Sequence, residues 1–486
     1  HQTMFYDKQV WCFSDKYNSS ILKNKNTNGL NIIFNGEIYN YKEIKVDLIS
    51  KWYNFTSNTD TEVILAAYLE RGESCVSKFN GMRSFALYDP NKNKLFCSRD
   101  RMWQKPFYYF RDWKKFIFSS EIKWILATWI DRILDIDQIH EYLLFHYTPW
   151  NKTLIKNIYK LPSASNLIFD LNKNSFSINK YWDIEVDSTK NDNFNNAVDF
   201  TDKILNDSVK IRTENSDVPV GTFLSWWLDS SLISALFKKY YKWSEFHTFN
   251  VVREDNLSNE SKFAKIVADD IWSKHHNVKI TGKMVLDNIE MLQKHYCDPI
   301  AEAGFIPNYF VSQYAKDFAT VILTWDGWDE VFAWYSYYSF LRKFWRLGQI
   351  PWIKSMARVL AKLLPISKYQ KWFEFLSNAK WSSYDNFFGH TISTFSTKEM
   401  DLLLTKKPKK NKEPFGIIKL TKKNFHSFLN QLIYTDQRVL LSECYNVKPD
   451  KALMWSSLEG RSPLQDYRLV EFAYTIPDKF KIKWNK

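Results

Sequence analysis

The sequence predicts two domains, one α+β and one α/β, and three observations lead to that prediction. The chain has 486 residues, more than a single hydrophobic core usually serves. Short apolar runs separated by turns fill its first part, which is typical of antiparallel strands. Further on, strands alternate with helices, which is typical of a doubly wound parallel sheet. The composition, 45% hydrophobic and 25% charged, is that of a globular protein without a membrane-spanning segment.

In the first part, a strand at 31–34 leads into Asn35-Gly36, which we interpret as a turn before a helix. Thr59 and Glu62 have the spacing of a capping box, and Gly72 stands where that helix should end. The runs SFALYD, KLFCSRD, FYYF and KFIFSS then predict antiparallel strands.

A polar stretch at 184–196 predicts a linker between domains at 1–183 and 197–486. The elements expected after it are helices at 197–212 and 260–271, strands at 218–224, 246–252 and 320–323, and a largely helical chain from Tyr335 onward. The basic run Lys406–Lys412 is expected to be a solvated loop, so the net charge of +13 is not taken as a sign of nucleic acid binding.

Two strand ends carry polar motifs. Ser225–Ser231 follows the first strand of the second domain and opens a helix, where backbone N–H groups can hold a phosphate and Asp229 a magnesium ion. Thr324–Glu330 follows a later strand and holds three carboxylates in five residues. Ordinary helix caps and a solvated acidic loop explain each motif alone. Two such motifs in one predicted sheet favour a shared nucleotide and metal site.

The glycine content is unusually low. The chain has 12 glycines, about 2.5% of its residues, and 21 tryptophans. A usual glycine level is about 7%. The two residue types together make up about 6.8% of the chain, so the tryptophan surplus matches the missing glycine.

The motifs, taken in order along nearly the whole chain, resemble those of glutamine-dependent asparagine synthetase. Ser225–Ser231 resembles the S-G-G-x-D-S loop of the N-type ATP pyrophosphatases. The other matching segments are Asn35–Asn40, Asp60–Glu62, Phe79–Met82, Ser98–Arg101, Ser119–Lys123, Ser216–Pro219, Thr324–Glu330 and Ser457–Pro463.

The resemblance implies a first domain with the αββα fold of N-terminal-nucleophile hydrolases, which releases ammonia from glutamine. Asn35 and Gly36 would form the oxyanion hole, and Glu37 and Asp60 would hold the amino group of glutamine. A plain turn and a helix-start acid are the simpler interpretations of these residues.

The second domain would bind ATP. The residues implied as ATP contacts are Leu224, Ser225, Trp226, Trp227, Asp229, Ser230, Val251, Thr324 and Trp325, with Leu224 and Val251 against the adenine. Asp229 and Asp329 would ligate Mg²⁺. Aspartate would attack the α-phosphate to give aspartyl-adenylate and pyrophosphate, and ammonia would then displace AMP.

The chain departs from the family pattern in three ways. None of its five cysteines matches the N-terminal nucleophile, so no catalytic residue is assigned, and both ends are expected to be truncated. Tryptophan stands at motif glycine positions, namely Trp103, Trp226, Trp227, Trp325, Trp328 and Trp334, and Trp52 and Trp272 also stand where the family tends to have glycine. Since the replacements are almost confined to glycine and all give tryptophan, we hypothesise that one codon, UGA, encodes glycine in the source organism. Trp182 would be a true tryptophan.

Two alternatives stay open: a related amidotransferase that adenylates another carboxylate, and an inactive remnant if the motif tryptophans are genuine. The odd cysteine count without CxxC pairs favours a reduced, cytoplasmic setting. The expected partners are aspartate, glutamine and ATP, with no nucleic acid and no membrane. The resemblance leaves a homodimer open.

Overall fold

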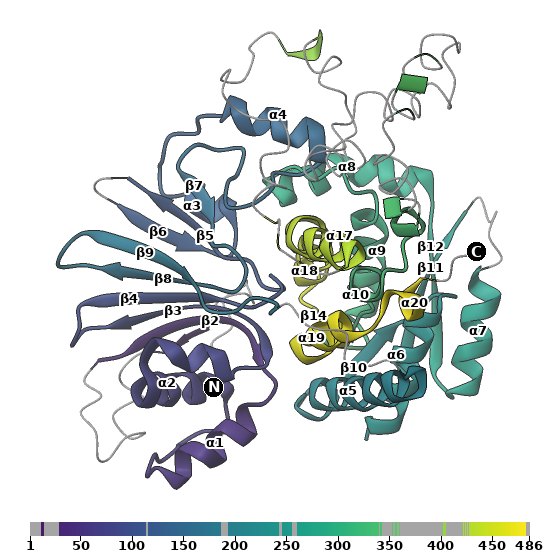
Figure 1. Ribbon diagram of the computed structural model, residues 1–486, viewed down its shortest axis with the longest axis horizontal. Coiled ribbons are helices and arrows are strands. Elements are labelled where there is room, and N and C mark those ends of the chain that lie inside the picture. Colours follow the sequence, from purple (N-terminus) through teal and green to yellow (C-terminus); the bar gives the residue numbers. More distant parts are fainter. Residues whose placement is uncertain are drawn as a thin grey trace.

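The computed structural model describes residues 29–112, 115–185, 193–242, 245–254, 260–339, 341–342 and 427–482, the backbone of 11–13, and single positions between 352 and 425. They form two bodies side by side, one with antiparallel sheets and one with a parallel sheet (Figure 1). The predicted loop at 406–412 lies outside the described residues. None of the helices in these ranges has the length together with the apolar character that a bilayer crossing requires.

The first body contains two antiparallel sheets. The six-stranded sheet has the order β1 (Trp11–Phe13), β2 (Asn31–Ile38), β3 (Gly81–Asp89), β4 (Lys94–Arg99), β8 (Ser165–Asp170) and β9 (Ser175–Lys180). The three-stranded sheet has the order β6 (Phe116–Ser119), β5 (Tyr108–Arg111) and β7 (Ile158–Lys160). The helices are α1 (Tyr41–Ser50), α2 (Asp60–Arg71), the 3-10 helix Gly72–Lys78, α3 (Ile122–Leu126) and α4 (Ile136–Phe145).

The alternation of side chains along the strands produces four layers. One face of the large sheet packs against α1 and α2, where Phe34, Phe85 and Phe96 meet the apolar side of α2. Its other face packs on the small sheet, from which Tyr109 points inward. The neighbouring Tyr108 points the opposite way, toward α3. The layers are therefore helix, sheet, sheet and helix, and the αββα prediction is confirmed.

The interpretation of Asn35-Gly36 as a turn was wrong. Strand β2 continues through both residues to Ile38, and Gly36 pairs with Arg83 of β3. Gly36 has a φ of 129°, and a Cβ there would lie 2.0 Å from the Met82 carbonyl oxygen. An Asn-Gly pair usually signals a turn, but here the glycine lets two strands approach closely. The helix end predicted at Gly72 is confirmed, with a φ of 60°.

The second body contains one parallel sheet, ordered β12 (Lys274–Ile280), β11 (His247–Arg253), β10 (Val220–Phe223), β13 (Val321–Leu323) and β14 (Glu459–Arg461). Its first helices are α5 (Phe194–Glu214), α6 (Leu228–Tyr240), α7 (Glu260–Asp270), α8 (Gly282–Tyr296), α9 (Phe305–Ala315) and α10 (Trp328–Phe332). The later elements are α17 (Phe428–Asp436), the π-helix Gln437–Tyr445, α18 (Val447–Trp455), the 3-10 helix Pro463–Gln465, α19 (Tyr467–Thr475) and α20 (Asp478–Lys481).

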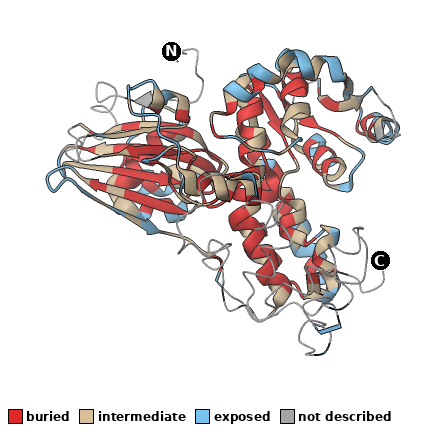
Figure 2. Cartoon of the chain, turned by 90° about the horizontal axis from the view of Figure 1, so that it is seen from above, coloured by how far each residue is buried: buried red, intermediate tan, exposed pale blue. Residues whose placement is uncertain are grey.

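Helices cover both faces of this sheet, so the doubly wound prediction is confirmed. On one face, Val220 and Val321 pack with residues of α5 and α6. On the other, Phe223 and Ile322 pack with residues of α9 and α18. Figure 2 shows buried residues along the sheets of both bodies and in the helices where the bodies meet.

The sequence did not predict two strands of this sheet. Strand β12 is an edge strand of mixed polar character, so its apolar pattern is weak. Strand β14 is three residues long and interrupts the region expected to be helical after Tyr335. Helix α5 begins at Phe194, inside the predicted linker, of which 186–192 lie outside the described residues. The domain boundaries stay predictions.

Two helices end at a tryptophan in the left-handed conformation. After α1, Trp52 has a φ of 67°, its N–H donates to Ile49 O at 3.0 Å, and Tyr53 N–H donates to Leu48 O at 3.1 Å. This is the Schellman motif, whose left-handed position usually holds glycine. After α7, Trp272 has a φ of 58° and makes the same pattern.

Tryptophan is overrepresented among such residues. Of 13 described non-glycine residues with positive φ, five are tryptophans: Trp52, Trp103, Trp129, Trp150 and Trp272. A bulky residue with positive φ is a conformational outlier, whereas glycine adopts it freely. The backbone at these five positions thus has the positive φ that it also has at Gly72.

Candidate functional site

The two polar motifs of the second domain lie at one edge of the parallel sheet. Strands β10 and β13 are parallel neighbours, and the motif loops follow their carboxyl ends. The chain leaves β10 toward β11 on one side, whereas β13 and β14 lie on the other side. The loops therefore meet at the point where the strand order reverses, which is where open α/β sheets bind ligands.

The first loop is held by serine hydroxyls and opens α6. Ser230 Oγ accepts a hydrogen bond from Ser225 N–H at 3.1 Å and lies 2.8 Å from Ser225 Oγ. Helix α6 begins at Leu228, so its free N–H groups face the loop. The Trp226 and Trp227 rings lie 4.3 Å apart, with 38% and 49% of each residue exposed. As printed, two indoles occupy the surface that a phosphate would need.

The second loop contains a glycine that the backbone requires. Gly327 has a φ of 103°, and a Cβ there would lie 2.8 Å from Gln465 Cγ. The neighbouring Asp326 carbonyl accepts hydrogen bonds from Ser462 Oγ at 2.5 Å and Gln465 Nε2 at 3.3 Å. The turn before α10 is thus anchored on the segment that follows β14.

Asp229 and Asp329, one from each loop, form an electrostatic pair. Burial raises the pKa of Asp329 to about 6, and the charge of Asp229 adds to that shift. Burial also raises the pKa of Asp229, with Asp326 acting in the same direction. One carboxylate oxygen of Asp229 is buried without a hydrogen-bond partner.

This donor set fits a magnesium ion that also binds phosphate. A cation would relieve the repulsion and give the buried oxygen of Asp229 a ligand. Within the described residues, no group of three or more acidic, histidine or cysteine side chains is arranged to hold a metal. Magnesium in nucleotide sites commonly takes one or two carboxylates, with phosphate oxygens and water completing its shell.

The two residues expected at the adenine lie at neighbouring strand ends. Leu224 follows β10, and its N–H donates to Phe249 O of β11 at 2.8 Å. Its side chain is fully buried against Ala264 and Ala268 of α7. Val251 lies in β11 and is half-buried. Leu224 is therefore closed to a ligand in this conformation, and its adenine contact stays a prediction.

The predicted glutamine site lies at the end of β2. Asn35 is 8% exposed, and Gly36 stands next to it in the strand. Asp60 begins α2, where its carboxylate accepts a hydrogen bond from Ile38 N–H at 2.9 Å. Asp60 and Glu37 are close enough that the charge of Asp60 raises the pKa of Glu37. The structure thus brings together the four residues that the sequence singled out.

Both carboxyls are partly withdrawn from water. Burial raises the pKa of Asp60 to about 6, against the hydrogen bonds from Ile38 and Thr61. Burial likewise raises the pKa of Glu37 well above its usual range, although 29% of its side-chain surface is exposed. An ammonium ligand therefore stabilises the ionised form of such carboxylates more than that of solvated ones.

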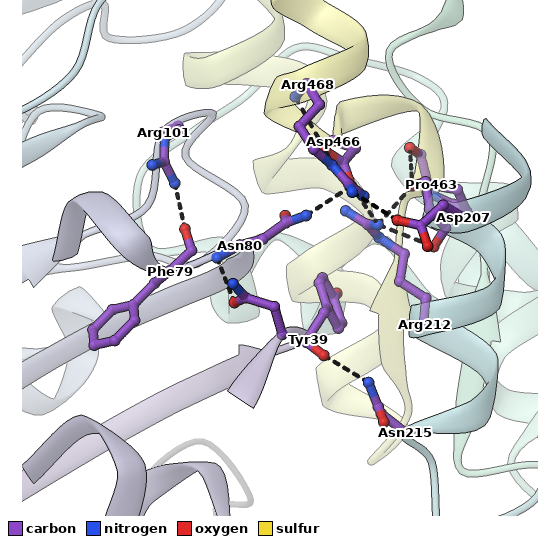
Figure 3. Close-up of polar contacts among 12 residues, drawn as sticks. Tyr39, Phe79, Asn80, Arg101, Asp207, Arg212, Asn215, Pro463, Asp466 and Arg468 are labelled. Carbon is purple, nitrogen blue, oxygen red and sulfur yellow. Dashed lines mark hydrogen bonds and ion pairs between the residues drawn. The ribbon is translucent and has the colours of Figure 1, made fainter. Parts of the chain in front are cut away.

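The contacts between the domains were not predicted. Arg461 of β14 forms an ion pair with Glu37 at 3.2 Å. Asp466 is fully buried and accepts a hydrogen bond from Asn80 Nδ2 at 2.9 Å, as Figure 3 shows. Arg461 and Asp466 lie in or beside a motif quoted from the sequence, but a single sequence gives no signal that this motif faces the other domain.

Comparison with known proteins agrees with this arrangement. The glutamine amidotransferase domain model matches residues 21–182, and the asparagine synthase model matches residues 201–486.

The chain is also similar to named relatives. It is 38% identical to a putative glutamine-hydrolyzing asparagine synthetase 2 of Methanocaldococcus jannaschii, over 69% of this chain and 64% of that protein. It is 30% identical to glutamine-hydrolyzing asparagine synthetases 1 and 3 of Bacillus subtilis, over 93% and 94% of this chain and 71% of each relative. The chain thus spans about two thirds of the length of these relatives, and it belongs to the asparagine synthase family.

Proposed function

We propose that the native protein makes asparagine from aspartate, ATP and glutamine. The observation that carries the proposal is the meeting of the two motif loops at the strand-order reversal, where the charge of Asp229 is close enough to raise the pKa of Asp329. A site for pyrophosphate and a divalent cation is what a carboxylate-activating enzyme needs at this edge.

In the synthetase site, the N–H groups at the start of α6 and the hydroxyls of Ser225 and Ser230 would bind the phosphates. Thr324 and the residue at 325 would bound the nucleotide from the second loop. Asp229 and Asp329 would hold Mg²⁺, which neutralises phosphate charge when bound. These groups would orient ATP so that an aspartate oxygen reaches the α-phosphate, and AMP would later leave on attack by ammonia.

In the glutamine site, Asn35 and Gly36 would donate hydrogen bonds to the oxyanion that develops on the amide oxygen. Glu37 and Asp60 would hold the ammonium of the substrate and so place the amide at the nucleophile. The family likeness implies an N-terminal cysteine as that nucleophile, and none of the five cysteines of this chain matches it. The homodimer is carried over from the family likeness, and the cytoplasmic location from the odd cysteine count without CxxC pairs.

We also propose glycine, rather than tryptophan, at the motif positions of the native chain. Trp52 and Trp272 support this because their backbone forms the glycine-type helix end. Trp182 differs, since its indole N–H donates to Glu471 at 2.6 Å. By the same codon rule, positions 226, 227 and 325 carry glycine, which opens the phosphate loop.

The test is pyrophosphate release from ATP by the chain with Trp226, Trp227 and Trp325 each replaced by glycine. With Mg²⁺ and ammonia, we expect release that depends on aspartate and yields asparagine in equal amount. The printed chain is the matched control and should release none. Pyrophosphate release that does not depend on aspartate but does depend on another carboxylic acid would contradict the proposal.

A further inference from the structure

Arg461 contacts both candidate sites. Its guanidinium forms the ion pair with Glu37 at 3.2 Å, next to the predicted oxyanion hole. Its main-chain carbonyl accepts a hydrogen bond from Thr324 N–H at 2.9 Å, at the start of the second nucleotide loop. The side chain of one residue thus reaches the glutamine site, while its main chain supports the ATP site.

The guanidinium is held firmly in this position. The Arg461 side chain is 3% exposed, and its Nε atom lies 2.7 Å from Glu459 Oε1. Its Nη1 donates to the Arg212 carbonyl at 2.9 Å. Each edge of the planar group therefore has a partner, which fixes the nitrogen that faces Glu37.

Hydrogen bonds around Arg461 fix the position of the two domains relative to each other. Asp466 accepts hydrogen bonds from Asn80 of the first domain, and also from Arg212 at 3.2 Å and Arg468 at 2.9 Å. Asn215 Nδ2 donates to the Tyr39 carbonyl at 2.6 Å, two residues beyond Glu37 (Figure 3). The pair between Glu37 and Arg461 thus lies inside a fixed interface.

We propose that Arg461 is a positioning residue for glutamine, supplied to the first domain by the second. Its guanidinium holds the Glu37 carboxyl toward the place where the ammonium of glutamine would bind, and its charge opposes the protonation that burial favours. Without a cation, a carboxyl in this surrounding would take up a proton or turn toward water. The inference rests on the proposed function and deepens it, because it makes the glutamine site incomplete without β14.

The test uses the full-length protein with glycine at the proposed positions and compares two reactions. In R461M, we expect the KM for glutamine to rise at least about tenfold, the usual effect of losing a partner that orients a ligand-binding group. Synthesis from saturating ammonia should keep its kcat and its KM for ATP within about twofold, since the main chain of β14 is unchanged. R461K should recover part of the glutamine use.

Arg438→Met is the matched control. Arg438 also bridges the domains, to Asp183 at 2.9 Å and Ser163 Oγ at 3.0 Å, but it contacts neither site. The KM for glutamine of this variant should equal that of the parent protein. An equal loss in both reactions of R461M, or no change in either, overturns the proposal.

Two further outcomes are also decisive. If R461M does not fold, a KM for glutamine in R461K within threefold of the parent protein overturns the proposal, and a larger rise supports it. If the parent protein makes no asparagine even from ammonia, the proposed function itself fails and this inference fails with it.

Discussion

Replacing the two helix-end tryptophans by glycine should stabilise the printed chain. A left-handed conformation costs a side-chain-bearing residue roughly 1–2 kcal/mol, and glycine adopts it without that penalty. Glycine also gives the unfolded chain more freedom, which removes about 0.4–1 kcal/mol of the gain. Trp52 and Trp272 are 86% and 84% exposed, so little packing is lost. Each replacement should therefore raise the free energy of unfolding by about 1 kcal/mol.

The assay is thermal unfolding of W52G and W272G, each followed by the transition of its own domain. For domains of this size, about 1 kcal/mol corresponds to a rise in Tm of roughly 2–4 °C. The alanine variants W52A and W272A are the matched controls, because they remove the indole and keep the backbone strain. Their Tm should stay near that of the printed chain.

A third control is Trp124→Gly. Trp124 lies inside α3 and is 49% exposed. Glycine in a helix interior should lower the stability by about 1 kcal/mol. The reasoning is refuted if glycine and alanine give the same Tm at both helix ends, since the left-handed backbone would then carry no strain.

Three other perturbations follow from the structure. In urea titrations, Gly36→Ala should lower the stability of the first domain by about 2 kcal/mol or more, because the added Cβ would meet the Met82 carbonyl. Gly282→Ala is the control and should be neutral or stabilising, because the space around Gly282 is open. Asp466→Asn should lower the free energy of unfolding by about 3 kcal/mol and the Tm with it, because it removes the buried charge that pairs with Arg212 and Arg468. A Tm within 1 °C of that of the parent protein would contradict this. Asp329→Asn should raise the Tm at pH 7.5 without Mg²⁺. The pKa of Asp329 is raised to about 6, so its ionised form destabilises the fold above that pH, and the advantage of the asparagine should shrink as the pH falls from about 6 toward 4; an advantage independent of pH would contradict the assignment.

The sequence predicted those parts of the fold that have a local signal. Apolar runs located β10, β11 and β13, and Thr59 and Gly72 marked the two ends of α2. The prediction failed where tertiary contacts override local chemistry. Gly36 continues a strand because β3 approaches it closely, and β14 forms only because β13 offers an edge for pairing.

The candidate sites could be predicted only in part. The loops after β10 and β13 were recognisable because polar residues follow apolar strands, and the strand order then brings them together. The contact of Arg461 with Glu37 joins residues more than 400 positions apart, and no periodicity or spacing indicates such a pair. The left-handed backbone of Trp52 and Trp272 likewise became visible only in three dimensions.

Peptide mass spectrometry of the protein from its own organism tests the central claim most directly. The decisive peptides cover positions 226–227 in the phosphate loop, and positions 52 and 272 at the helix ends. The account predicts glycine at all four positions and tryptophan at 182. Tryptophan at 226 and 227 would contradict it, because the loop could not then hold a triphosphate and the chain would be an inactive member of its family.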